Sequence, residues 1–152
     1  MTDIEKLYAI NETREVMARY VRFADEKKFK ELASLFTPTG TFTPLKVNGD
    51  VWIRMEGREE IAKIVSAGVG QAVAIHHLFS YETEILTPTT AHSVISMEDR
   101  VIHPDDEVLP KNETAFRTLH GFGHYHVDFV KAEGTWYIAK LVLTRLKMDF
   151  TH

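Results

Sequence analysis

The chain has 152 residues, 44% of them hydrophobic and 26% charged, which is the size and balance of one folded domain, expected over residues 1–152. A net charge of −4 without a basic block argues against a nucleic-acid partner, and the lack of cysteine excludes disulfides, thiolate catalysis and cysteine metal ligands. No apolar stretch approaches the ~20 residues of a membrane helix, and the N-terminus lacks a signal peptide's layout, so we expect no membrane partner and a cytoplasmic protein.

The first part of the chain has helical periodicity. Residues 4–24 carry apolar side chains at spacings of three and four, and a second, shorter stripe covers 26–36. Asp25 stands between the two stripes, where a helix N-cap would offer an acceptor oxygen to free backbone amides. Two short strands are expected around a turn at 48–50, and a third, short helix is expected after Gly57.

From residue 75 onward the helical period disappears. Turn-type residues separate four strand-like segments, which cover 75–86, 91–103, 115–130 and 135–148. Helices followed by strands with short connections predict an α+β fold, with a mostly antiparallel sheet curled round one face of the helices. Gly121 and Gly123 indicate a strongly bent strand, and bent strands would shape the sheet into a cone with a mouth.

Period-two alternation predicts which side of each strand faces the interior. On 75–86 the odd positions are apolar or aromatic and the even positions hold both acids, so His77 is expected inside and His76 outside. Phe79 and Tyr81 would then line the interior beside His77. The same reasoning places four downstream residues inside, namely Met97, His103, Tyr125 and Phe129. The aromatic stripe is most simply core, although it would also suit a flat, hydrophobic ligand.

Three histidines of segment 115–130 invite a metal interpretation. His120, His124 and His126 share one strand face, and His-x-His is a spacing that suits a metal ion. That face lies opposite Tyr125, and only Asp128 is placed to complete a ligand set. We therefore predict no metal site.

Three stretches together resemble a known family. Residues 19–42, 57–61 and 124–146 are similar to the SnoaL-like branch of the nuclear transport factor 2-like superfamily. The shared pattern includes an aromatic residue with an acid five positions on, here Tyr20 and Asp25, before an LxxLF helix. The resemblance implies a cone-shaped barrel of mixed, mostly antiparallel sheet, a hydrophobic small-molecule ligand, and self-association as dimers or trimers.

Within the superfamily, the scytalone dehydratase, bile-acid dehydratase and lindane dehydrochlorinase branch is the most similar. It implies an aspartate–histidine pair, which the matching positions assign to Asp25 and His77. A second histidine of scytalone dehydratase corresponds to His103. The tyrosine and the C-terminal arginine of bile-acid dehydratase correspond to Tyr20 and Arg145. Thr39 and Tyr81 depart from the family pattern in positions that line the pocket, so substrate identity does not carry over.

These residue types suit an elimination next to a carbonyl group. An imidazole titrates near neutral pH, and a carboxylate bonded to one ring nitrogen makes the other nitrogen a better base. Asp25 would orient the base His77, while His103 and Tyr20 would polarise the substrate oxygen or protonate the departing hydroxyl. The predicted function is a lyase or isomerase of dehydratase type that needs no cofactor.

Other functions stay open for the same fold. One is a non-catalytic binding or accessory module, such as the β subunit of ring-hydroxylating dioxygenases. Another is proton transfer of the ketosteroid isomerase or polyketide cyclase type, which uses a carboxylate base. The single residues also have plainer roles: a helix cap for Asp25, a surface strand end for His103 and a surface ion pair for Arg145.

Overall fold

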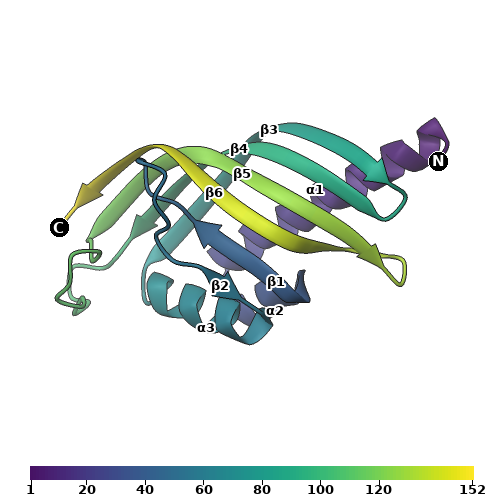
Figure 1. The fold of residues 1–152 in the computed structure, drawn as a ribbon. Coiled ribbons are helices and arrows are strands. Elements are labelled where there is room, and N and C mark those ends of the chain that lie inside the picture. Colours follow the sequence, from purple (N-terminus) through teal and green to yellow (C-terminus); the bar gives the residue numbers. More distant parts are fainter.

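The computed structural model describes all 152 residues and consists of three helices and one six-stranded sheet (Figure 1). The helices are α1 (Asp3–Asp25), α2 (Phe29–Ser34) and α3 (Arg58–Val69). The strands are β1 (Phe36–Pro44), β2 (Met55–Glu56), β3 (Val73–Thr87), β4 (Thr90–Ile102), β5 (Thr118–Ala132) and β6 (Thr135–Thr151). None of the helices has the length and apolar character needed to cross a membrane.

The first helix is defined by its cap and its buried stripe. Thr2 and Glu5 form a capping box at its start, which satisfies two backbone amides that have no partner within the helix. Its buried side chains recur every three to four residues and face the sheet, as predicted for 4–24. Asp25 is the last residue of α1, and α2 has Lys28 at its N-cap position with no side-chain bond. The prediction that Asp25 caps the second helix is therefore wrong.

The six strands form one curved sheet in the order β2-β1-β6-β5-β4-β3. β1 pairs with β6 in parallel, and every other neighbouring pair is antiparallel. The sheet arches over the helices, which lie on its concave side (Figure 1). The predicted α+β class and mixed sheet are confirmed, but the sheet stays open between β2 and β3 and does not close into a barrel.

The concave side of the sheet holds two apolar clusters. The larger one packs α1, α2 and α3 against the strands and includes Tyr20, Met97, Tyr125 and Phe129. The smaller one comprises Ala72, Val101 and Leu119, with Phe116, Met148 and Phe150 packed against it. Buried and partly exposed residues alternate along β4 and β5 as the period-two pattern predicts.

A β-bulge reverses the alternation in the middle of β3. Leu78 pairs with Met97 and Tyr81 pairs with Ile95, so two residues of β3, at 79 and 80, lie opposite Ser96 alone. The Ser96 hydroxyl accepts the backbone N–H of Ser80 at 2.8 Å, which supports the bulge. Even positions therefore face inward before the bulge, and odd positions face inward after it.

Candidate active site

Asp25 and His76 form a hydrogen-bonded pair on the concave side of the sheet. Asp25 Oδ1 lies 2.7 Å from His76 Nδ1, and Asp25 Oδ2 accepts the backbone N–H of His76 at 3.3 Å. Both carboxylate oxygens are thus engaged by one residue, which fixes the rotamer of Asp25 and the orientation of the imidazole. The His76 side chain is 13% exposed, and its Nε2 has no hydrogen-bond partner in the chain. An imidazole held in this way presents Nε2 as a free base.

Asp25 occupies an unfavourable place for a carboxylate. It is the last residue of α1, where the helix dipole presents partial negative charge. A negative side chain at that end typically costs ~0.3–1 kcal/mol. The two bonds from His76 offset this cost, so the pair is held by tertiary contact rather than by the helix.

His77 does not take the role predicted for it. Its side chain is exposed on the outer side of β3, and its ring contacts Phe79 at 6.3 Å between centroids. Phe79 is itself 60% exposed. The bulge explains both errors, because the aromatic pattern at Tyr81 and beyond does face inward but does not extend back across residues 79 and 80. The inward placement of His77 and Phe79 is wrong.

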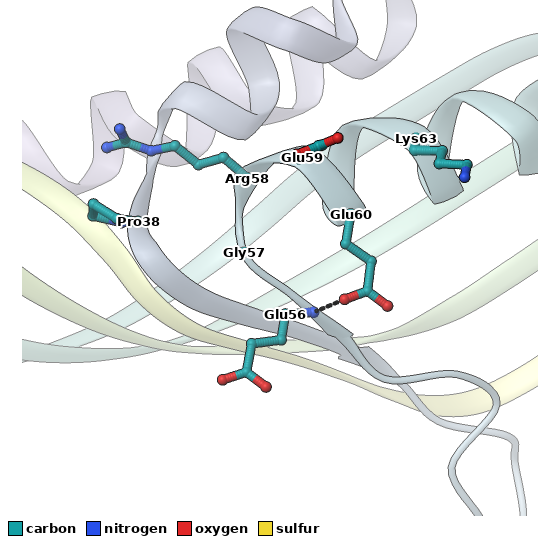
Figure 2. A pocket seen from close by; sticks show the side chains of 7 residues that line it. All are labelled: Pro38, Glu56, Gly57, Arg58, Glu59, Glu60 and Lys63. Carbon is teal, nitrogen blue, oxygen red and sulfur yellow. Dashed lines mark hydrogen bonds between the residues drawn. The ribbon is translucent and has the colours of Figure 1, made fainter.

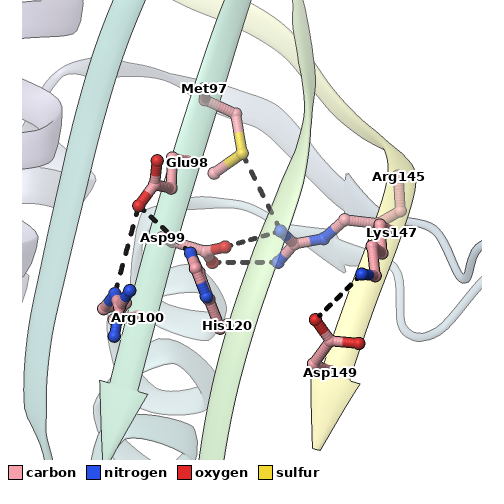
Figure 3. Close-up of polar contacts among 8 residues, drawn as sticks. All are labelled: Met97, Glu98, Asp99, Arg100, His120, Arg145, Lys147 and Asp149. Carbon is pink, nitrogen blue, oxygen red and sulfur yellow. Dashed lines mark hydrogen bonds and ion pairs between the residues drawn. The ribbon is translucent and has the colours of Figure 1, made fainter.

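A buried ion pair lies beside the Asp25–His76 pair. His76 is directly opposite Asp99 on β4, and Asp99 accepts two hydrogen bonds from Arg145, at 2.6 Å from Nη1 and 2.9 Å from Nη2 (Figure 3). Both side chains are 6% exposed. A Cβ on Gly121 would lie 2.7 Å from Asp99 Oδ1 and 2.5 Å from Arg145 Nη1, so only glycine leaves room for this pair. Arg145 is buried, and Asp99 is not among the residues predicted from the sequence.

Three hydrogen-bond donors near this pair have no partner in the chain. Arg145 Nε is fully buried and unpaired, which is rare for a buried N–H. Tyr20 and Tyr125 are 3% and 1% exposed, with ring centroids 5.7 Å apart, and neither hydroxyl forms a hydrogen bond. Burial and the nearby Asp99 carboxylate raise the pKa of Tyr20 and of Tyr125, while Arg145 lowers both pKa values in part. Both phenols therefore stay protonated and can donate.

The other residues predicted to contact a ligand lie at different distances from the Asp25–His76 pair. Met97 is buried with its Sδ 3.8 Å from Arg145 Nη1, so it lies at the site. Tyr81 is half-buried beyond the bulge, with its ring under the Arg14 guanidinium at 4.5 Å. Phe129 is fully buried in the core, eight residues along β5 from Gly121, which corresponds to ~27 Å. The structure does not bring Phe129 to the site.

His103 is also inside, in a separate part of the concave surface. It lies four residues after Asp99, directly past the end of β4 at Ile102, a distance of ~13 Å if the chain stays extended. Its Nδ1 lies 2.9 Å from Glu107 Oε1. Sequence reasoning did not find Glu107, because it lies in an irregular loop whose fold has no periodic signal.

A hollow of about 300 Å³ lies at the C-terminal end of β6. Met148 and Phe150 form part of its lining, together with Val47 and Trp52 from the segment between β1 and β2. Met148 pairs across the strands with Gly121, the residue beneath the Asp99–Arg145 pair. Lys46, Glu113, Thr114 and His152 complete the lining, so the hollow is half apolar and half polar, and its lining includes neither Asp25 nor His76.

A larger hollow lies at the start of α3 and has a different character. Figure 2 shows its lining, in which five charged side chains accompany Pro38 and Gly57; its volume is about 610 Å³. Glu60 is already bonded there to the backbone N–H of Glu56 at 3.2 Å. Neither Asp25 nor His76 lines this hollow, and charged side chains form most of its lining.

The other histidines lie on the convex face of the sheet, which no helix covers. His92 bonds to Asp128 at 2.7 Å, His120 to Glu98 at 3.1 Å, and His126 Nε2 to Thr144 Oγ1 at 3.0 Å. No three histidines, aspartates or glutamates converge as a group that could hold a metal ion. His92, His120 and His126 are therefore each bonded to a neighbouring side chain.

His126 makes stability depend on pH. Its pKa is lowered, first by burial and then by His124 and His92, so the folded protein binds a proton there less readily than the unfolded chain. Stability from this residue is complete above the ordinary histidine pKa of ~6.5 and is lost as pH falls through the lowered value. We expect His126→Gln to lose less thermal stability than the parent between pH 7.5 and pH 5, measured by melting temperature. An equal loss in both proteins would contradict this.

Comparisons with known proteins agree with the fold. The profile of the SnoaL-like domain family matches residues 5–142. A protein proposed to be a scytalone dehydratase, from Novosphingobium aromaticivorans DSM 12444, is similar with 16% identity and a TM-score of 0.81 over 99% of this chain and 93% of that one. Hexachlorocyclohexane dehydrochlorinase LinA-type3 from Novosphingobium barchaimii LL02 has 13% identity and a TM-score of 0.78 over 98% and 94% of the two chains. At these identities the two structures show a shared fold. No curated protein matches the chain.

Proposed function

The chain belongs to the SnoaL-like domain family, and we propose that it is a lyase or isomerase that eliminates a small group, such as water, from a hydrophobic small molecule without a cofactor. The observation that carries the proposal is the Asp25–His76 pair, with Nε2 of the imidazole free. The names of two similar structures, a dehydratase and a dehydrochlorinase, support elimination as the reaction class.

In the proposed reaction His76 Nε2 removes a proton from the carbon next to a carbonyl group. Asp25 keeps the proton of the imidazole on Nδ1 and stabilises the imidazolium that forms, as carboxylates do beside catalytic histidines. Both oxygens of each carboxylate at the site are already engaged, those of Asp25 by His76 and those of Asp99 by Arg145. This favours an imidazole base over the carboxylate base of the ketosteroid isomerase type.

The unpaired donors would stabilise the charge that develops on the carbonyl oxygen. Arg145 Nε–H and the hydroxyls of Tyr20 and Tyr125 lie in one low-dielectric region and have no protein acceptor. Fixed donors of this kind lower the barrier because they need no reorganisation as charge appears. Each Nη atom of Arg145 donates one N–H to Asp99, and Nε–H is left without a partner in the chain, so it is available to a carbonyl oxygen.

Ring opening of 5-nitrobenzisoxazole tests this function without knowledge of the natural substrate. A base removes its C–H proton, the N–O bond breaks, and a coloured phenolate forms. We expect saturable catalysis well above that of free imidazole at the same pH, and inhibition by a neutral aromatic ketone of similar size. A rate no higher than that of free imidazole would overturn the proposed function.

A further inference from the structure

We propose that the first turns of α1 in one copy of this chain dock into the groove between α2 and α3 of a second copy. The contact joins two different surfaces, so each copy offers its helix end to one neighbour and its groove to another. The inference is independent of the proposed reaction, because neither surface includes Asp25 or His76.

An exposed apolar patch lies on the first turns of α1. Ile4, Leu7 and Tyr8 are 66%, 65% and 67% exposed, although apolar side chains are stabilised by leaving water. Their spacing of three and four residues places them on one side of the helix, opposite the buried stripe that faces the sheet. Figure 1 shows this end of α1 extending past the ends of the strands. These three residues, the α1 patch, are therefore left uncovered by their own chain.

The groove between α2 and α3 is a second surface without a partner. It is a hollow of about 870 Å³, larger than the hollows at the end of β6 and at the start of α3. Four of its ten lining residues are apolar, including the buried Ala33 and the half-buried Phe29 and Ala62. A groove with an apolar floor between two helices suits the apolar side of a third helix.

The charges around the two surfaces are opposite in sign. Lys30, Arg58 and Lys63 line the groove, and Glu59 is the only acid in its lining. Around the α1 patch, four acids and two bases are exposed between residues 3 and 15. Complementary charges of this kind steer two copies into the correct orientation. The four acids are Asp3, Glu5, Glu12 and Glu15.

The helix end that fills the groove has to come from a second copy. α1 has 23 residues, which corresponds to a length of about 34 Å. α2 begins directly after the turn at 26–28, so the groove lies at the opposite end of α1 from the patch of the same chain. A patch and a groove on different surfaces make a head-to-tail contact. Two helical turns bury less than the roughly 1,000 Å² of a stable interface, so we expect reversible association that depends on concentration.

Two variants that each block one surface test the contact by complementation. Leu7→Lys puts a charge of the wrong sign into the patch, and Ser66→Trp fills the groove from an exposed position of its lining. Each alone should self-associate roughly tenfold or more weakly than the parent in sedimentation velocity. An equimolar mixture should form a heterodimer and grow no further, because one variant keeps its groove and the other its patch. Val108→Lys, at a position 94% exposed, is the control and should associate like the parent.

Three results of this experiment would overturn the proposal. The first is a parent that stays monomeric at every concentration. The second is association that neither variant weakens, which would assign the contact to another surface, such as the convex face of the sheet. The third is a mixture of the two variants in which no heterodimer forms. Circular dichroism checks that each variant keeps the fold, which both exposed positions allow.

Single cysteines give a second readout, since the chain contains none. Leu7→Cys and Ser66→Cys are mixed under mild oxidation, and we expect the disulfide between them to form faster than that of either variant with Val108→Cys. Adding Lys30→Glu and Lys63→Glu to the Ser66→Cys chain should slow the reaction, as should added salt in the original mixture. Equal rates in all mixtures would show random collision and would overturn the contact.

Discussion

His76→Gln is expected to abolish elimination, and His77→Gln is expected to leave it intact. Glutamine keeps the size and polarity of the side chain at 76 but supplies no base of suitable strength, and a positioned base contributes on the order of 10²–10⁴ to rate. His77 is the adjacent residue on the same strand, yet it is exposed on the opposite face. The two variants therefore each remove one imidazole, from adjacent residues on opposite faces of the strand. The measurement is kcat/KM on 5-nitrobenzisoxazole, with circular dichroism to confirm that both variants fold.

Asp25→Asn completes this series. Asparagine keeps the shape of the side chain but does not stabilise an imidazolium, so activity should fall toward that of His76→Gln. Asparagine also removes a negative charge from the C-terminal end of α1, where it is unfavourable. This gain offsets part of the stability that the variant loses with the His76 bonds. A fall in both His77→Gln and His76→Gln, or in neither, would contradict the assignment of the base.

The bulge in β3 is the feature that made the prediction from sequence choose His77 instead of His76. Alternation on β4 and β5 placed the inward residues correctly, and Asp25 was identified from its register after the first helix. On β3 the pattern was also right beyond Tyr81. An extra residue in a strand shifts the face of every residue before it, and the two residues of the bulge, Phe79 and Ser80, look like ordinary strand residues. The bonds from Ser80 to Ser96 that support the bulge join segments whose pairing no local pattern reveals.

Asp99 was missed for a different reason. It lies on the apolar face of its segment, between Met97 and Val101, and a carboxylate in such a stripe is a signal that a partner must be buried with it. The partner, Arg145, is 46 positions away in sequence, on β6, and β5 lies between it and Asp99 on β4. Gly121 joins the two, since its missing side chain is what lets the pair span β5. Gly121 and Arg145 were singled out from the sequence, but only the register of the strands connects them with Asp99.

Arg145→Met is expected to destabilise the protein by about 3–5 kcal/mol, because it leaves the Asp99 carboxylate buried without a partner. Arg100→Met is the control, because Arg100 also pairs with a carboxylate, that of Glu98, with 4.0 Å between Nε and Oε1 (Figure 3). The Arg100 side chain is 51% exposed, so its loss should cost less than about 1 kcal/mol. Urea denaturation at constant pH measures both. A loss in Arg145→Met no greater than in Arg100→Met would show that the buried pair does not hold the site together.

The double variant Asp99→Leu/Arg145→Met separates stability from function. Replacing both ions by apolar side chains removes the desolvation cost together with the attraction, so stability should return close to that of the parent or exceed it. Activity should not return, because the unpaired Nε–H beside Tyr20 and Tyr125 is lost with Arg145. A stable double variant with parental activity would mean that the ion pair is structural and that the tyrosines alone stabilise the oxygen. A stable and inactive one would mean that the chain keeps a costly buried charge pair because the reaction needs the guanidinium.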